Sequence, residues 1–499
     1  MKRRSFCFCV ALLATLVAGL PDLRAQERDG KADETWQVIN LSGQRVGYGR
    51  VSMRKFERDG KTLYRTENTQ HMTIKRFGQS LTIETISRTE ETEDGHLLNY
   101  EFEMNNPPKS SSKTAGTVNG RKLTIVSTVG GLERTRTIDF DPTLKSPGYQ
   151  ERMIKANPLK PGETRSFRIF LPEYGKATDV KVNADDMREV KVHDGSTKKL
   201  LKVRTSMTIV PGVEIRSFID KEGETLRSEA DIFGLQMLTF KVPEEVALKK
   251  IAGAELDIAV NTLVKVNNPP VNLHRSKKAV FKITTKGKNP ADLIPVGETQ
   301  SIRELSENSV ELTVTAIAPP KNIQASRDKK DFLKSTGFLQ TEDARVKDHA
   351  RKAAAGSADP GTVAVRMEKY VHKELKKKNF STALASAAEV AKSLEGDCTE
   401  HACLLAAMLR TQQIPSRVVV GLVYAERFGA FGGHMWTEAW LDGKWVPLDG
   451  TLGAGGIGGG HIKLAASDLG DDGPAPVTSF LPLMNLLSNV KIEVVRADR

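Results

Sequence analysis

The first half of the chain alternates between β-rich runs and turn-forming residue pairs. Residues 81–88 and 122–129 are two such runs, in which apolar side chains recur largely at every second position. The pairs between runs are Asp59-Gly60, Asp94-Gly95, Asn119-Gly120 and Asp194-Gly195. A period of two is typical of strands with one buried face, and these pairs favour tight hairpin turns. Residues 26–250 are therefore predicted to form an antiparallel β-sheet domain.

A second group of strand signals follows a short connecting stretch. Residues 279–285 and 310–316 are rich in apolar and β-branched residues, and Pro319-Pro320 ends this section. We interpret residues 251–320 as a small β module or a linker. The alternative is that these strands extend the first sheet.

After Pro320 the apolar period becomes helical. Residues 343–355 are rich in helix formers, and Asp359-Pro360 supplies a capping residue and a proline suited to a first helical turn. The next helix is predicted to carry an apolar stripe at every fourth position. The stripe comprises Val363, Met367, Val371 and Leu375. Such a stripe indicates a helix that packs on a core.

Two more helices are predicted on either side of Gly396. Ser381 can cap a helix over 383–394, and Gly396 ends it. The second helix begins at Cys398 and has an inner apolar stripe. This stripe comprises Ala402, Leu405, Ala406 and Leu409. With the strand signals that follow, these helices indicate an α+β domain over 321–499.

Cys398 lies at the N-terminus of its predicted helix, where backbone geometry stabilises an anion. The first N–H groups of a helix lack intrahelical partners and the dipole is positive there, so a thiolate or a developing oxyanion is favoured. Cys403 lies in mid-helix, and we interpret it as a small packing residue. Five residues of helix turn the two thiols about 140° apart, so a disulfide would require the helix to break. Two free thiols are predicted.

A predicted hairpin brings two chemistry-bearing side chains together. The turn at Asp442-Gly443 sets its register, because a two-residue loop pairs the residues that flank it. That register places Asp449 opposite Trp436. His434 lies two residues before Trp436 and points to the same face, so His434 and Asp449 are predicted to be within side-chain reach. A histidine oriented by a carboxylate is the general base that a thiol nucleophile requires.

Three motifs follow one another in the C-terminal domain. They are Gly396-Asp397-Cys398-Thr399-Glu400-His401-Ala402, His434-Met435-Trp436-Thr437-Glu438 and Trp445-Val446-Pro447-Leu448-Asp449. Over residues 359–449 the chain resembles the transglutaminase-like superfamily, which implies a papain-like α+β fold. The catalytic triad that the resemblance implies is Cys398, His434 and Asp449. Animal transglutaminases also hold the oxyanion with an upstream tryptophan. Because no tryptophan lies between Trp36 and Trp436, the second oxyanion donor is left unassigned.

Several nearby residues have a second interpretation. Cys398 with His401 or Cys403 could ligate a metal, but a second pair at zinc-finger spacing is missing, so no metal site is predicted. Glu400 and His401 either line the cleft or belong to a solvated helical turn. We interpret His461, which follows a glycine run, as loop decoration rather than a substrate contact. The tryptophans interpreted as packing residues are Trp436, Trp440 and Trp445.

These residues predict a thiol enzyme that acts on amide or peptide carbonyls. Cys398 would attack the carbonyl to form a thioester acyl-enzyme, and His434 would carry the proton. Hydrolysis is favoured over amine transfer for two reasons. Water is the abundant acceptor outside the cell or in the periplasm, and the tryptophan of animal transglutaminases is missing. The expected partner is a protein or peptide substrate, of which cell-wall peptide is one class. No cofactor is expected, and the oligomeric state is unknown. The alternative is a binding or scaffolding protein with a vestigial thiol domain.

The first 25 residues predict a signal peptide. Lys2-Arg3-Arg4 precede the apolar run 6–20, and Leu23-Arg24-Ala25 offers a cleavage site, so the mature chain is expected to begin near Gln26. The chain is thus expected in the periplasm or outside the cell, with no membrane anchor after cleavage; an uncleaved anchor is the alternative. The formal charge of +12 falls to about +9 without the leader. Because basic and acidic residues are interleaved, no nucleic-acid partner is expected.

Overall fold

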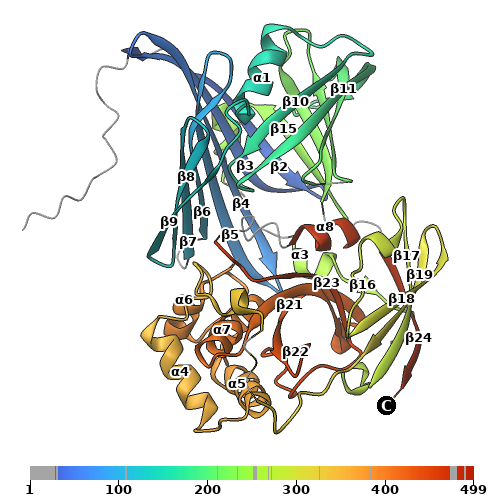
Figure 1. Cartoon of the computed structure of the whole chain (residues 1–499). Coiled ribbons are helices and arrows are strands. Elements are labelled where there is room, and N and C mark those ends of the chain that lie inside the picture. The colour runs from blue at the N-terminus through green and yellow to red at the C-terminus, as the bar shows by residue number, and fades with distance from the viewer. Residues whose placement is uncertain are drawn as a thin grey trace, which may run out of the picture.

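The computed structural model has a large curled sheet stacked on a smaller body of helices and sheets (Figure 1). It describes residues 28–498 except 30–31, 107–109, 211, 233, 251–255, 268, 271, 325, 327, 383, 472–479 and 488–489. The predicted signal peptide over 1–25 lies outside the described residues. Among the helices of the described segments, none has the length and apolar character that crossing a membrane requires.

Residues 28–242 form one antiparallel sheet of 15 strands. Its strands are β1 (Arg28–Asp29), β2 (Asp33–Leu41), β3 (Gln44–Arg58), β4 (Lys61–Arg76), β5 (Gln79–Thr92), β6 (Leu97–Asn106), β7 (Ser110–Asn119), β8 (Lys122–Val129), β9 (Leu132–Asp139), β10 (Thr164–Leu171), β11 (Lys176–Lys191), β12 (Thr197–Met207), β13 (Glu214–Ile219), β14 (Thr225–Ile232) and β15 (Leu235–Val242). From β2 to β9 and from β10 to β15 each strand pairs with the next, β15 pairs with β2, and β1 adds to β3. Helix α1 (Pro147–Ala156) joins the edge strands β9 and β10.

The predicted strand and turn signals account for this sheet. In β8, Leu123 and Ile125 are fully buried, whereas the alternate side chains face away from the core. At the β3–β4 turn Asp59 and Gly60 have φ angles of 51° and 70°, which a type I′ hairpin turn requires at both central positions. The antiparallel domain that the alternation predicts is confirmed.

A separate four-stranded sheet follows, in the order β18-β19-β17-β24. Its strands are β17 (Lys278–Thr285), β18 (Gln300–Ser306), β19 (Ser309–Thr315) and β24 (Val490–Asp498). These strands pair with one another in a sheet of their own rather than with the strands of the first sheet. The fourth strand comes from the end of the chain, with Ile283 opposite Ile492. The end of the predicted 321–499 domain thus belongs to this four-stranded sheet. Local sequence signals do not reveal the pairing, because β17 and β24 lie far apart in the sequence.

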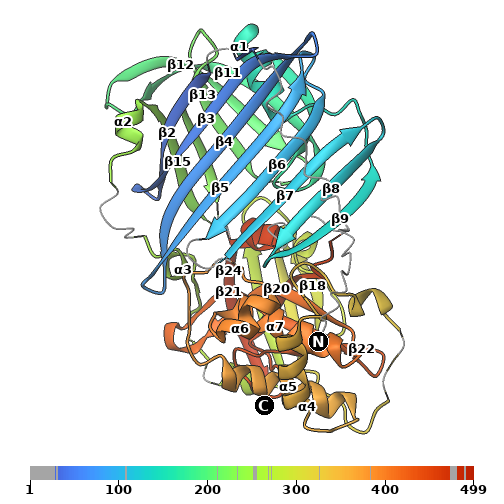
Figure 2. The ribbon, with the colours of Figure 1, turned by 90° about the vertical axis from the view of Figure 1, so that its left-hand side faces the viewer.

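The third sheet and the helices that cover it form the lower body (Figure 2). Its strands are β16 (Val264–Lys265), β20 (Ser416–Ala425), β21 (Ala430–Leu441), β22 (Lys444–Leu448) and β23 (His461–Ser467). The helices are α4 (Ala344–Ala354), α5 (Pro360–Glu374), α6 (Ala387–Ser393) and α7 (Cys398–Thr411). Shorter elements are α2 (Glu244–Ala247), α3 (Ile258–Asn261), α8 (Leu481–Leu487), η1 (Leu273–Arg275), η2 (Pro290–Asp292), η3 (Lys330–Leu333) and η4 (Glu426–Phe428). Helix α7 packs on β20 and β21, and α4, α5 and α6 surround it. The predicted α+β class is confirmed.

One predicted helix begins later than expected. The structure starts α6 at Ala387, capped by Ser386, rather than at 383 with Ser381 as its cap. Ser386 and Glu389 form a capping box, in which each side chain bonds the backbone of the other residue. The backbone N–H of Ala385 donates instead to Glu400 Oε1 at 3.0 Å, so the residues before α6 are held as a loop against α7. The prediction was wrong because this competing bond comes from another helix.

Candidate active site

The N-terminus of α7 presents Cys398 at the edge of a buried site. Asp397 caps the helix by accepting from Thr399 N at 2.9 Å, and Glu400 accepts from Asp397 N at 2.9 Å. This capping box requires Gly396, because a Cβ at that position would lie 2.3 Å from Cβ of Glu400. The Cys398 side chain is half-buried, so a substrate can reach the sulfur.

The β21–β22 hairpin brings together the other two residues of the predicted triad. Leu441 pairs with Lys444, so the predicted register is confirmed. His434 Nε2 lies 2.8 Å from Asp449 Oδ2, and both side chains are buried. The Cys398 side chain lies beside His434, close enough to act on the pKa of its imidazole. The structure thus places all three predicted residues in one connected group.

The charges in this group reinforce one another. Burial alone would lower the pKa of His434, but the negative charges of Asp449 and the Cys398 thiolate, with their hydrogen bonds, raise it to about 10. Burial would raise the pKa of Asp449, yet the charge of His434 and its hydrogen bond hold that pKa well below its usual range. The His434 imidazole beside Asp449 is therefore protonated at neutral pH.

His461 is a functional neighbour that the sequence interpretation missed. It opens β23, is fully buried, and its Nε2 lies 3.0 Å from the same Asp449 oxygen that His434 contacts. Burial lowers the pKa of His461 to about 4, so it is a neutral N–H donor to Asp449. The interpretation as loop decoration is wrong. Only the pairing of β23 with β20 brings His461 here, and no local pattern signals it.

The indole of Trp436 closes one side of this group. Its ring stacks on His434, with centroids 6.2 Å apart, and meets His461 edge-on at 5.2 Å. Trp440 and Trp445 pack against each other at the far end of the hairpin. These contacts agree with the interpretation of all three as packing residues.

Glu368 of α5 holds the loop that carries Asp449. This carboxylate accepts from Asp449 N at 2.9 Å and from Gly456 N at 2.9 Å, and it is fully buried. Burial raises its pKa to about 7. Glu368 was not predicted, because a glutamate beside the apolar stripe of a helix has the same pattern as a surface residue.

Glu400 and His401 are both buried, so the interpretation as a solvated helical turn is wrong. His401 Nδ1 lies 2.5 Å from Asp397 O, and its Nε2 accepts from Lys378 Nζ at 3.2 Å. Burial lowers the pKa of His401 to about 4, which keeps the ring neutral beside this cation. Lys378 thereby brings a positive charge to this end of α7, where burial lowers its pKa and the charge of Asp449 opposes that effect.

The curled sheet itself contacts the start of helix α7. Strand β4 ends at Arg76. The Nη2 atom of Arg76 lies 2.6 Å from Asp397 Oδ2, and its Nη1 donates to Thr382 O at 3.0 Å. Burial and the Asp397 charge raise the pKa of Glu400 to about 8, so the two carboxyls share one negative charge. Arg76, on a strand of the curled sheet, pairs with that charge. Sequence analysis assigned the sheet no role at the site.

We expect Arg76→Ala to weaken the start of α7. Removing one partner of a buried pair costs about 3–5 kcal/mol where both charges are enclosed, and less here because Arg76 is partly exposed. Activity should fall by about tenfold or more as Cys398 loses its fixed position. Lys75→Ala, next to it on β4, is the matched control.

A double variant makes this test specific. Arg76→Ala/Asp397→Asn keeps a capping oxygen and removes the unpaired charge, so it should recover part of the activity and of the free energy of unfolding. Equal effects of Arg76→Ala and Lys75→Ala would contradict a role for this pair.

His434, Asp449 and His461 are also a possible metal-ligand set, since their ligand atoms lie within 4.8 Å of one another. Both Nε2 atoms, however, lie at hydrogen-bond distance from the single oxygen Asp449 Oδ2. A protonated His434 offers no lone pair to a metal. The geometry of these three residues therefore fits a hydrogen-bonded group better than a metal centre.

Both thiols of the described chain are free, as predicted. Cys403 is fully buried in the main hydrophobic core of the lower body, and burial raises its pKa. It is a packing residue, which leaves Cys398 as the thiol available for chemistry.

A half-buried thiol at a helix start, beside a histidine and an aspartate on neighbouring strands, is the arrangement by which thiol enzymes activate a nucleophile. Comparison with known families agrees: the family model of the transglutaminase-like superfamily matches residues 347–450. These residues form a transglutaminase-like domain, so the predicted resemblance is confirmed. No curated protein matches the sequence.

Three solved structures show distant similarity. A candidate cysteine protease from Cytophaga hutchinsonii is 16% identical, with a TM-score of 0.28, over 39% of this chain and 78% of that one. A beta-barrel-like protein of a domain of unknown function from Brucella abortus is 11% identical, with a TM-score of 0.29, over 42% and 95%. A candidate protease from Parabacteroides distasonis is 12% identical, with a TM-score of 0.19, over 70% and 64%.

Proposed function

We propose that the chain is an exported thiol enzyme that cleaves amide or peptide bonds, with Cys398, His434 and Asp449 as its catalytic triad. The single observation that carries the proposal is the buried His434–Asp449 pair beside a thiol at a helix N-terminus. The basic and apolar start of the sequence supports export to the periplasm or beyond. A protein or peptide is the proposed substrate.

The reaction has two halves. The Cys398 thiolate forms a C–S bond with the carbonyl carbon, and the His434 imidazolium gives its proton to the departing amine as the C–N bond breaks. Water then attacks the thioester: His434 takes a proton from the water, the C–S bond breaks, and the carboxylic acid leaves. Asp449 stabilises the imidazolium in both halves and holds the ring with Nδ1 toward the sulfur.

Two donors support the developing oxyanion. The free backbone N–H groups at the start of α7 supply one, because they have no intrahelical partner. We assign the second to Lys378, whose ammonium donates to His401 at 3.2 Å and lies within electrostatic range of Cys398. Hydrolysis is favoured over amine transfer, because water is the abundant acceptor and the crosslinking tryptophan is missing.

The pH dependence of turnover tests this assignment. Since the pKa of His434 rises from an ordinary value of 6.5 to about 10, the imidazolium persists through neutral pH and is lost only near pH 10. The stabilisation it gives to the fold is complete below pH 6.5 and disappears as the pH rises through about 10. A pH–rate profile on an amide substrate should therefore keep its activity into the alkaline range and fall near pH 10.

An ordinary histidine would give a different profile. A change in turnover near pH 6.5, in either direction, would mean that His434 titrates at its ordinary pKa. That result would contradict the His434–Asp449 ion pair. No turnover of peptides or amides at any pH would instead favour the alternative, a binding protein with a vestigial thiol domain.

A further inference from the structure

The curled sheet encloses a cavity of about 900 Å³ that the thiol chemistry does not use. It is lined by the inner faces of strands from β3 to β14 and by α1, and its lower end is bounded by Phe338 and Leu469 of the other body. This volume lies at the upper end of the roughly 300–1,000 Å³ typical of small-molecule sites. A sheet domain that served only as a scaffold would fill such a space with side chains.

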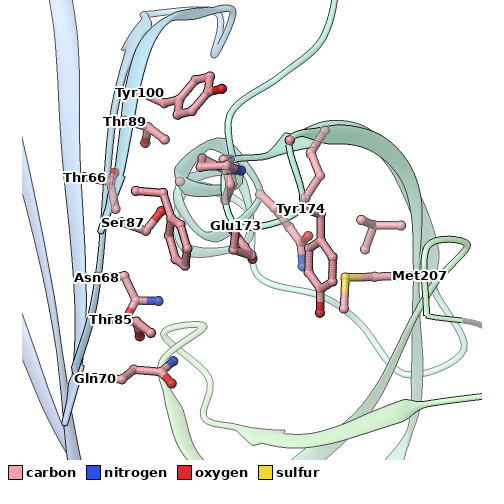
Figure 3. Close-up of a pocket in the computed structure, with 18 of the residues that line it drawn as sticks. Thr66, Asn68, Gln70, Thr85, Ser87, Thr89, Tyr100, Glu173, Tyr174 and Met207 are labelled. Carbon is pink, nitrogen blue, oxygen red and sulfur yellow. The ribbon is translucent and has the colours of Figure 1, made fainter. Parts of the chain in front are cut away.

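The two walls of the cavity differ in chemistry (Figure 3). Uncharged polar side chains on β4 and β5 form one wall: Thr66, Asn68, Gln70, Thr85, Ser87 and Thr89. Aliphatic side chains on β10 to β13 form much of the other: Ile169, Val180, Val182, Val203, Ile215 and Ile219. A ligand that satisfies both walls has an apolar body and polar groups along one side.

Several polar atoms in the cavity have no partner in the described part of the chain. They include the hydroxyls of Tyr100 and Thr66, whose side chains are more than nine-tenths buried, and Oδ1 of Asn68. Leaving such groups unpaired costs free energy, and a bound molecule with hydrogen-bonding groups would recover it. The orphaned atoms therefore indicate a polar ligand group at the β4–β6 wall.

Charges at the cavity favour an uncharged ligand. Glu173 projects into the space from the side opposite β4 and has no ion-pair partner among the described residues (Figure 3). Burial raises its pKa, which favours the protonated, hydrogen-bond-donating form over the anion. Arg134 is already paired with Asp471 at 2.8 Å, and Glu151 contacts Lys155 at 3.3 Å. The remaining charged lining residue, Arg136, has contacts of its own.

A peptide fits this space less well than an acyl chain. The backbone groups of β4 and β5 are consumed in pairing with each other and with their outer neighbours, so no strand edge is offered to a peptide there. The wall over β10–β13 is mostly aliphatic, and its polar side chains in the lining, Thr205 and Ser217, are too few to pair with the second side of a peptide backbone. We propose that the curled sheet binds an uncharged amphiphile, a lipid with an acyl chain against β10–β13 and neutral polar groups at β4–β6.

Titration with a fluorescent lipid tests this proposal on the full mature chain. The probe is a monoacylglycerol with a pyrene-labelled acyl chain, and saturable one-to-one binding is expected. Ser87→Trp fills the cavity and should lower affinity by about tenfold or more. Ile86→Trp places the same side chain on the outer face of β5, outside the cavity lining, and should change affinity by less than about twofold.

A gentler variant separates binding from folding. Tyr100→Phe removes only the orphaned hydroxyl, so the unliganded protein should keep its melting temperature or gain slightly. Affinity for the monoacylglycerol should fall by about two- to tenfold, while a pyrene-labelled alkane binds unchanged. Cys398→Ser should bind the probe like the wild type. A failure of the lipid-binding proposal is therefore distinguishable from a failure of the proposed thiol mechanism.

Three outcomes would overturn the proposal. These are no saturable binding to the wild type, equal losses in Ser87→Trp and Ile86→Trp, or displacement of the probe by neutral peptides at stoichiometric concentration. The last outcome would assign the cavity to a peptide ligand instead.

Discussion

Cys398→Ser is expected to lower the turnover of an amide substrate by at least about a thousandfold. The serine hydroxyl has nearly the same shape, so the capping box of Asp397 and Glu400 should survive. What is lost is the thiolate, which the His434 imidazolium and the helix start both stabilise. A serine hydroxyl is not ionised near neutral pH and would need full general-base activation by a histidine that is already protonated.

Cys403→Ser is the matched control for this substitution. Cys403 lies five residues further along α7 and is fully buried in the core. A hydroxyl there should cost about 1–3 kcal/mol of unfolding free energy and leave turnover per folded molecule nearly unchanged. Turnover of each variant would be measured on amide or peptide substrates. The free energy of unfolding would be measured by chemical denaturation. If Cys398→Ser retained wild-type turnover, the triad would be refuted.

Asp449→Asn is expected to lower turnover by about 10²–10⁴-fold. The carboxylate receives Nε2–H donors from both His434 and His461, at 2.8 and 3.0 Å. An amide carries no charge, so it does not stabilise the imidazolium. Its one oxygen also cannot serve both the two rings, which share Oδ2, and the backbone N–H of Thr451, which donates to Oδ1 at 2.8 Å. The pKa of His434 should fall from about 10 toward its ordinary value, and the alkaline limb of the rate profile should move down with it.

Asp442→Asn provides the comparison on the same hairpin. Asp442 is exposed at the turn with a φ of 51°, a conformation that asparagine accepts. This variant should retain wild-type activity and an unshifted profile. An Asp449→Asn enzyme with an alkaline limb still near pH 10 would show that the carboxylate does not set the pKa of His434.

Local sequence signals predicted much of the site. The turn at Asp442-Gly443 fixes the ladder, and the ladder fixes which side chains share a face, so the His434–Asp449 contact followed from a few residues. The start of α7 at Cys398 was equally local, because its capping box lies within four residues.

Residues that reach the site from distant elements could not be predicted in this way. His461 arrives through the pairing of β23 with β20, Glu368 through a helix that precedes the nucleophile, and Arg76 through a hairpin of the other body. Each of these side chains is polar and would be ordinary on a surface. Only the three-dimensional arrangement gives them partners, and their burial follows from that arrangement.

The same limit applies to the fold. Alternation predicted the strands of the first sheet, but not that they curl around a cavity with a polar and an apolar wall. Apart from Met72, the residues of β4 and β5 that line the cavity are threonine, serine, asparagine and glutamine, which a pattern of buried and exposed positions would assign to solvent.

Capture of the acyl group on Cys398 is the most direct test of the central claim. The enzyme would be mixed with a pool of peptides and small amides, quenched in acid within the time of a turnover, digested and analysed by mass spectrometry. A substrate-derived acyl group should appear on the peptide that contains Cys398, be released by hydroxylamine as a thioester is, and be missing in Cys398→Ala. Substrate cleavage without any adduct at Cys398, or the same adduct in Cys398→Ala, would contradict the proposed mechanism.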